Sequence, residues 1–227
     1  NRYRLRPLLP VRSDADLFAA RTVSVNRLYL AYTHSFRQDL HLALMTGYLE
    51  EMYGGAGGEV LYRPFGARYA LGAEGWSVLK RDPYTPFNLA LTQDARWSAH
   101  VNGWYDLPDW DVTLFAKAGH YFAGDIGGTV GLKKTFNNGA ALEGYTTVTD
   151  LADPDIFGGT THAVHGVRLT LPLGGFKYAP QDSRIRLRAE PLGRDSGQYI
   201  DNPLPLYEAT EPFTLQHMAE HWSDITP

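Results

Sequence analysis

The sequence predicts an all-β protein, an antiparallel transmembrane β-barrel of about 10 to 12 strands with irregular N- and C-terminal segments. From residue 27 onward, segments of about ten residues alternate in polarity, as strands with one apolar face do. Glycine (23), tyrosine (14) and tryptophan (5) are plentiful; aromatic residues favour strands, and glycine allows tight turns. No apolar run approaches the roughly 20 residues of a membrane helix. A mean hydropathy of −0.30 still suits strands that place only alternate residues against lipid.

The length of 227 residues suits a single all-β domain. We expect an irregular or connecting segment at residues 1–26, the barrel at residues 27–192, and an irregular, plug-like tail at residues 193–227. The stretch Phe213 to Trp222 could form a short helix after Pro212. The abrupt start at Asn1 is typical of a mature fragment or of the later part of a longer polypeptide.

The clearest alternation lies between Trp97 and Phe122, interrupted by a tight break at Pro108-Asp109. Trp110 and Phe122 are assigned to its apolar side. The apolar set that should face lipid comprises Trp97, Val101, Tyr105, Val112, Leu114 and Ala116. The polar set that should face the lumen comprises Arg96, His100, Asn102, Thr113 and Lys117.

The remaining segments bring the expected number of strands to about ten. They cover residues 28–32, 40–48, 60–63, 69–79, 129–136, 140–149, 163–173 and 184–191. The sequence Asn137-Asn138-Gly139 predicts a hairpin turn, because Asn-Gly tolerates positive φ angles. The glycine-rich run Gly54 to Gly58 lacks the Gly-Lys-Ser/Thr of a phosphate loop, so we interpret it as a flexible hairpin loop.

Composition and motifs argue against several function classes. A net charge of −4 and a pI near 6.1 do not fit a nucleic-acid partner. The absence of cysteine excludes disulfides and thiolate metal sites. His217 to His221 matches the H-x-x-E-H zinc pattern, but the motif is terminal and lacks a third ligand, so we expect no zinc. Carboxylates occur without an evident acid/base pair, so we predict no catalytic residue, no cofactor and no enzyme.

A row of arginines is the most suggestive local feature. Arg184, Arg186 and Arg188 alternate with apolar residues, so the three guanidinium groups share one strand face. Arginine in mid-bilayer costs about 2–4 kcal/mol, so the row should face the lumen or a rim. Its partners would be either carboxylates such as Glu143 or Glu74, or an acidic sugar. The candidate polysaccharide-facing residues are Arg184, Arg186, Arg188, Lys117 and Trp104.

The C-terminal half carries a family resemblance. The segment RIRLRAEPLGRDSGQYI at residues 184–200, followed by NPLPLY at residues 202–207, resembles the C-terminal part of the YjbH exopolysaccharide-biosynthesis family, which includes the capsule protein GfcD. FGGTTH at residues 157–162 and LPL at residues 171–173 add to it. The resemblance implies an outer-membrane, β-rich protein that works with exopolysaccharide or capsule machinery. It nominates no catalytic residue.

Together these observations predict an outer-membrane barrel that assists export or surface assembly of an exopolysaccharide. Its partners would be the polysaccharide, outer-membrane lipid, and export proteins or further domains of the same polypeptide. Two alternatives remain at this point. A soluble sugar-binding β-sandwich would bury the same apolar stripes against a second sheet, and a polysaccharide-modifying enzyme would need a convergent carboxylate pair or a metal site.

Overall fold

The protein is built on one sheet of consecutive antiparallel strands. The computed structural model describes residues 10–20, 23–136, 138–154, 159–173, 183–191, 193–215 and 218. In these residues ten strands lie in sequence order, each paired antiparallel with the next, and this confirms the all-β, antiparallel prediction. The strands are β1 (Leu28–Arg37), β2 (Leu40–Tyr48), β3 (Tyr53–Tyr62), β4 (Tyr69–Arg81), β5 (Leu91–Leu107), β6 (Val112–His120), β7 (Ile126–Thr135), β8 (Ala141–Pro154), β9 (Thr160–Pro172) and β10 (Arg184–Ala189).

Helices are short. α1 (Ala15–Ala19) lies within the segment that we expected to be irregular, and α2 (Leu206–Ala209) follows β10. The 3₁₀ turns are η1 (Pro86–Asn88), η2 (Pro108–Trp110) and η3 (Glu211–Phe213), and η2 is the break predicted at Pro108. No helix in the described ranges is long and apolar enough to cross a membrane. Most of the expected helix at Phe213 to Trp222 lies outside the described residues.

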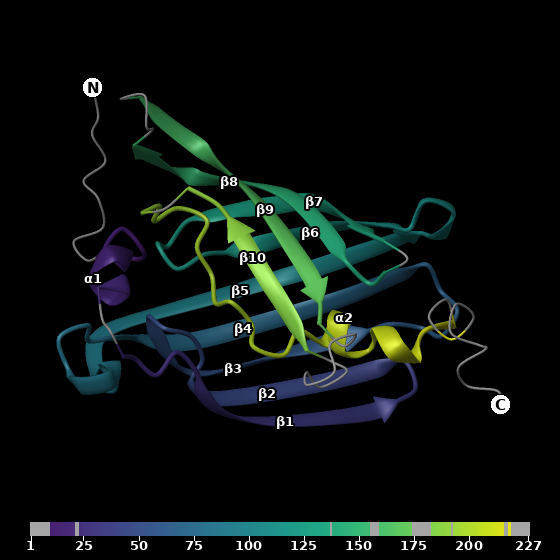
Figure 1. Cartoon of the computed structure of the whole chain (residues 1–227), viewed down its shortest axis with the longest axis horizontal. Helices are drawn as coiled ribbons and strands as arrows, with labels where there is room; N and C mark the ends of the chain where they lie inside the picture. The colour runs from purple at the N-terminus through teal and green to yellow at the C-terminus, as the bar shows by residue number, and fades with distance from the viewer. Residues whose placement is uncertain are drawn as a thin grey trace.

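The sheet curves strongly, so that β8, β9 and β10 cross in front of the earlier strands (Figure 1). The segment that follows β10 runs along the concave side of the sheet. Among the described residues, β1 and β10 are the two edge strands, so the sheet is open where the predicted barrel would be closed. The strands form a single sheet, and the two packed sheets of a sandwich are not observed in them.

The two faces of β5 and β6 divide as predicted. Trp97 and Val101 are 55% and 63% exposed, whereas His100 and Asn102 are 3% and 7% exposed. Ladder pairing carries this division across the sheet, because directly opposed residues share a face. The alternation of polarity therefore separates a convex face from a concave one.

The convex face carries exposed apolar side chains on all ten strands, with a smaller number of polar ones such as His34, Thr46 and His165 among them. Its charged side chains, Arg37, Lys134 and Asp150, lie at strand ends. Between them stand exposed apolar side chains, which include Leu30, Leu44, Val60, Leu71, Trp97, Val101, Leu114, Val130, Leu132, Val148, Val167 and Leu187. An exposed apolar surface of this extent is typical of a face that contacts another apolar medium or a partner.

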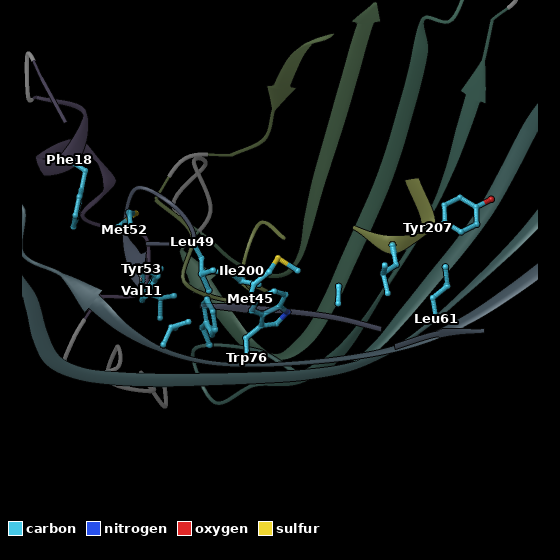
Figure 2. Packing of buried hydrophobic residues seen from close by; sticks show 14 of the residues in the cluster. Val11, Phe18, Met45, Leu49, Met52, Tyr53, Leu61, Trp76, Ile200 and Tyr207 are labelled. Atoms are coloured by element: carbon cyan, nitrogen blue, oxygen red, sulfur yellow. Dashed lines mark hydrogen bonds between the residues drawn. The ribbon is translucent and has the colours of Figure 1, made fainter. Parts of the chain in front are cut away.

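The concave side holds the hydrophobic core (Figure 2). Met45, Leu61 and Trp76 project from the sheet towards residues of the terminal segments, among them Phe18 of α1 and Ile200. The inside of the curve is therefore filled by packed side chains.

Phe122 corrects the prediction for the apolar side of the second segment. β6 ends at His120, and Phe122 turns into the concave core, where it is 2% exposed and packs against Tyr53 with ring centroids 5.0 Å apart. The alternation of side-chain direction holds only within a strand, so it does not predict the direction of a residue beyond the end of β6.

The glycine-rich run is also different from the prediction. Gly54 to Gly58 is not a loop but the first half of β3, paired on both sides with β2 and β4. A Cβ at Gly55 would lie 2.3 Å from the carbonyl oxygen of Ser77 and 2.7 Å from the Cα of Val78. Glycine is required there because the neighbouring backbone comes so close.

We expect Gly55→Ala to lower the free energy of unfolding by about 1–3 kcal/mol, since the added methyl group meets backbone that cannot move aside. The control is Gly144→Ala, because a Cβ at Gly144 would meet nothing within 4 Å. Its effect should stay near zero or be slightly stabilising. Urea unfolding followed by tryptophan fluorescence measures both. Equal effects of the two substitutions would contradict this account.

Candidate functional site

The chain after β10 is held on the concave side by carboxylates that accept backbone N–H groups. Asp153 Oδ2, at the end of β8, accepts from the backbone nitrogens of Asp195 and Ser196 at 2.9 and 2.8 Å, and from Ser196 Oγ at 2.7 Å. Asp125 Oδ2 accepts from the Gly197 nitrogen at 2.7 Å. Burial raises the pKa of Asp125, although this hydrogen bond opposes the shift. We call residues 193–210 the inner segment.

Further along, Glu59 holds the inner segment against β3. Its Oε2 accepts from the Leu206 nitrogen at 3.0 Å and from Asn202 Nδ2 at 2.9 Å. Glu59 lies directly opposite Glu74 on β4, so the fold brings two carboxylates together on the concave face. Both carboxylates are buried, and each already accepts a hydrogen bond from another group of the protein.

The N-terminal segment is tied to the same place. Asp195 Oδ1 accepts from the backbone nitrogens of Val11, Arg12 and Ser13 at 2.8–3.0 Å. The Arg12 guanidinium forms an ion pair with Glu50 at 2.8 Å. Residues from the two ends of the described chain therefore share one set of hydrogen bonds.

Lys117 faces the interior, as its parity predicted, and is part of a buried charged cluster. Its Nζ forms a short ion pair with Glu74 Oε1 and lies 3.9 Å from the ring centroid of Tyr199. His100 Nδ1 lies 3.4 Å from the same Glu74 oxygen. The ammonium group is neutralised by the protein, so contact between Lys117 and a polysaccharide remains a prediction.

Trp104 also faces inward, but its ring is covered. It stacks on Tyr207 with centroids 4.7 Å apart and an interplanar angle of 7°. The other face of this cluster is closed by Arg63, whose guanidinium carbon lies 4.2 Å from the Tyr207 centroid. The contact between Trp104 and a polysaccharide likewise stays a prediction.

The arginine row of β10 shares the concave-side parity, with Ile185 and Leu187 on the convex side. Arg186 pairs with Glu208, and Arg188 pairs with Glu190 at 2.8 Å.

The two carboxylates that were named as candidate partners of this row have other partners. Glu143 binds Arg168, and Glu74 binds Lys117. Arg184, Arg186 and Arg188 thus remain candidates for contact with sugar rather than established contacts.

A polar cavity of about 470 Å³ opens at the end of the sheet where β1 and β3 begin and β2 and β10 end. We call it the mouth pocket. Its wall joins both terminal segments, the β2–β3 turn and the residues after β10. Its lining residues are Arg12, Ala15, Asn26, Arg27, Glu50, Glu51, Met52, Arg188, Glu190, Pro191, Gly193, Arg194, Gln198 and Asp201.

Several arginines stabilise the charged form of Asp201 in the mouth pocket. Desolvation favours the neutral acid, but Arg27, Arg188 and Arg168 together hold the pKa of Asp201 below its ordinary value. Arg27 donates directly to the Asp201 carboxylate. The pocket therefore favours negative charge at this position.

Metal ligation finds no support in the described ranges, where no group of three or more His, Cys, Asp or Glu side chains could hold an ion. The H-x-x-E-H motif lies mostly outside the described residues, so the absence of zinc at His217 and His221 stays a prediction.

The comparisons with known proteins agree with the resemblance seen in the sequence. The YjbH family model, described as exopolysaccharide biosynthesis protein YbjH, matches residues 2–212. The chain belongs to this family. A relative from Escherichia coli (strain K12), named an uncharacterized lipoprotein YjbH, is 32% identical over 203 residues, which cover 88% of this chain and 29% of the relative. The chain thus spans less than a third of that relative. No solved structure matches.

Sequence reasoning missed the residues that fasten the inner segment. Asp125, Asp153 and Asp195 are isolated carboxylates, and no local motif marks them as acceptors for distant backbone groups. Glu59 carried one usable signal. It lies two residues before Leu61 and so shares the face of that apolar residue, whereas Val60 between them faces outward. This spacing would have placed Glu59 on the buried face once the strand was recognised.

Proposed function

We propose that this chain forms an outer-membrane β-barrel region that assists export or surface assembly of an exopolysaccharide. The observation that carries the proposal is the convex face, where apolar side chains on all ten strands lie between charged groups at strand ends. Membership of an exopolysaccharide biosynthesis family is the reason for proposing a polysaccharide as the exported material. The relative from Escherichia coli is named a lipoprotein, and this name is compatible with a location at a membrane.

In lipid the sheet would need a closed edge, because unpaired backbone groups of β1 and β10 cannot bond to water there. An even number of consecutive antiparallel strands allows β1 and β10 to close in the same antiparallel sense. The inner segment and the core fill the interior, so this region alone is not a wide conduit. Export would then depend on partner proteins or on the rest of a longer polypeptide.

The proposal assigns no catalysed reaction to the chain. Carboxylates that approach each other, such as Glu59 and Glu74, are engaged by Leu206 and Lys117. A binding or organising role therefore accounts for the interior better than hydrolysis does.

Val130→Arg tests the membrane assignment. Val130 is 61% exposed in the middle of β7, so an arginine there would be harmless in water. Against hydrocarbon it should cost about 2–4 kcal/mol. We expect a reduced yield of folded protein in the outer-membrane fraction, together with a loss of the heat-modifiable gel mobility that folded barrels show.

The matched control is Tyr84→Arg, which replaces a side chain 72% exposed between β4 and β5. It should leave folding and extraction unchanged. The membrane assignment fails if the wild-type chain leaves the membrane fraction in buffer without detergent and Val130→Arg behaves like the control. The polysaccharide role is tested separately by measuring the amount of surface exopolysaccharide on cells that lack the protein. We expect this amount to decrease clearly relative to wild-type cells.

A further inference from the structure

The mouth pocket contains a largely buried arginine that has no counter-ion among the described residues. Arg194 is 8% exposed. Its Nη1 atom is enclosed and lacks a hydrogen-bond partner in the described residues, where its guanidinium also forms no ion pair within 4.0 Å. Buried arginines are almost always paired, because an uncompensated charge inside a protein is costly. An anion that arrives from outside would supply the missing partner.

The other arginines of the pocket are already neutralised. Arg12 pairs with Glu50, Arg27 with Asp201, and Arg188 with Glu190. These ion pairs line the wall together with the side-chain amides of Asn26 and Gln198. This combination suits a ligand that carries many hydroxyl groups and one negative charge.

Glu51 is the remaining carboxylate of the wall. It lies in the β2–β3 turn, is only partly buried and forms no ion pair within 4.0 Å among the described residues. Water can solvate it, so it does not need Arg194 as a partner. It would instead repel an anion in the pocket, which provides a second, independent position for a test.

We propose that the mouth pocket binds a carboxylate-bearing sugar unit of a polysaccharide, with Arg194 as its counter-charge. The inference deepens the proposed function and rests on it for the choice of a sugar as ligand. The guanidinium fork recognises a carboxylate with two parallel hydrogen bonds. A volume of about 470 Å³ is within the range of small-molecule sites.

Ligand binding is measured by calorimetry on the whole chain in detergent, with trigalacturonate as the acidic probe and maltotriose as its neutral counterpart. We expect the acidic probe to bind at least tenfold more tightly. Arg194→Met should remove this preference, and Glu51→Gln should strengthen binding of the acidic probe severalfold. Equal affinities for the two probes in the wild type, or an unchanged preference in Arg194→Met, would overturn the proposal.

Stability without ligand distinguishes a binding role from a structural one. Because the described residues supply no counter-ion to Arg194, Arg194→Met should raise the urea midpoint of the ligand-free protein. The matched control is Arg12→Met, which breaks the ion pair with Glu50 and should lower the midpoint. A lower midpoint in Arg194→Met would mean that the guanidinium is held by the protein itself, and the proposal would be wrong.

Membrane fractionation of the same variants separates this proposal from the previous one. A wild-type chain that needs detergent for extraction but binds both probes equally would contradict only the sugar site. A chain that leaves the membrane in buffer yet prefers trigalacturonate would contradict only the barrel.

Discussion

Asp153→Ala should lower the free energy of unfolding by about 3–5 kcal/mol, because it leaves three buried donors of Asp195 and Ser196 without an acceptor. The loss should detach the inner segment before the sheet itself unfolds. Limited proteolysis is therefore expected to cut the variant near residues 193–198 under conditions in which the wild type is resistant. Urea unfolding measures the free-energy change.

Asp150→Ala is the control on the same strand. Asp150 accepts one exposed hydrogen bond, from the Ile126 nitrogen at 2.9 Å, so its loss should change stability by less than about 1 kcal/mol. If the two variants are equally stable and equally resistant to protease, the inner segment is not held through Asp153.

Glu74→Gln should have a comparable effect, also about 3–5 kcal/mol, because it leaves the ammonium group of Lys117 buried without its counter-charge. A second substitution provides the decisive comparison. In the double variant Glu74→Gln with Lys117→Met, both charges are absent, and most of the lost stability should return.

Urea unfolding of the wild type, both single variants and the double variant completes this cycle. A double variant less stable than either single variant would contradict the ion pair as the reason for the cost. Such a result would point instead to the contacts that Glu74 and Lys117 make with Trp76 and Tyr199.

The strands could be predicted from sequence because each places apolar and polar residues on opposite faces over many positions. This repetition located β5 and β6 and assigned Trp97 and His100 to the correct sides. It failed where the signal was lost. The glycines of β3 show no polarity to alternate, and Phe122 lies just beyond the end of its strand, where parity no longer applies.

The interior was less predictable because its contacts join distant parts of the chain. The inward direction of Arg186 and Arg188 followed from alternation, but their partners Glu208 and Glu190 did not, since a row of charges does not identify its counter-ions. Arg194 was not nominated at all. Its importance arises from the buried Nη1 atom, which has no partner among the described residues, and a sequence does not display this.

The hydrogen bonds of Asp195 have a consequence for the order of folding. Each strand pairs with the next one along the chain, so the sheet can grow hairpin by hairpin with short loops to close. The bond from the Val11 nitrogen to Asp195 joins residues 184 positions apart. Contacts of such long separation form slowly, because the chain must be brought together before they contribute. We infer that the sheet forms first and that both terminal segments enter it afterwards, as a late and shared step.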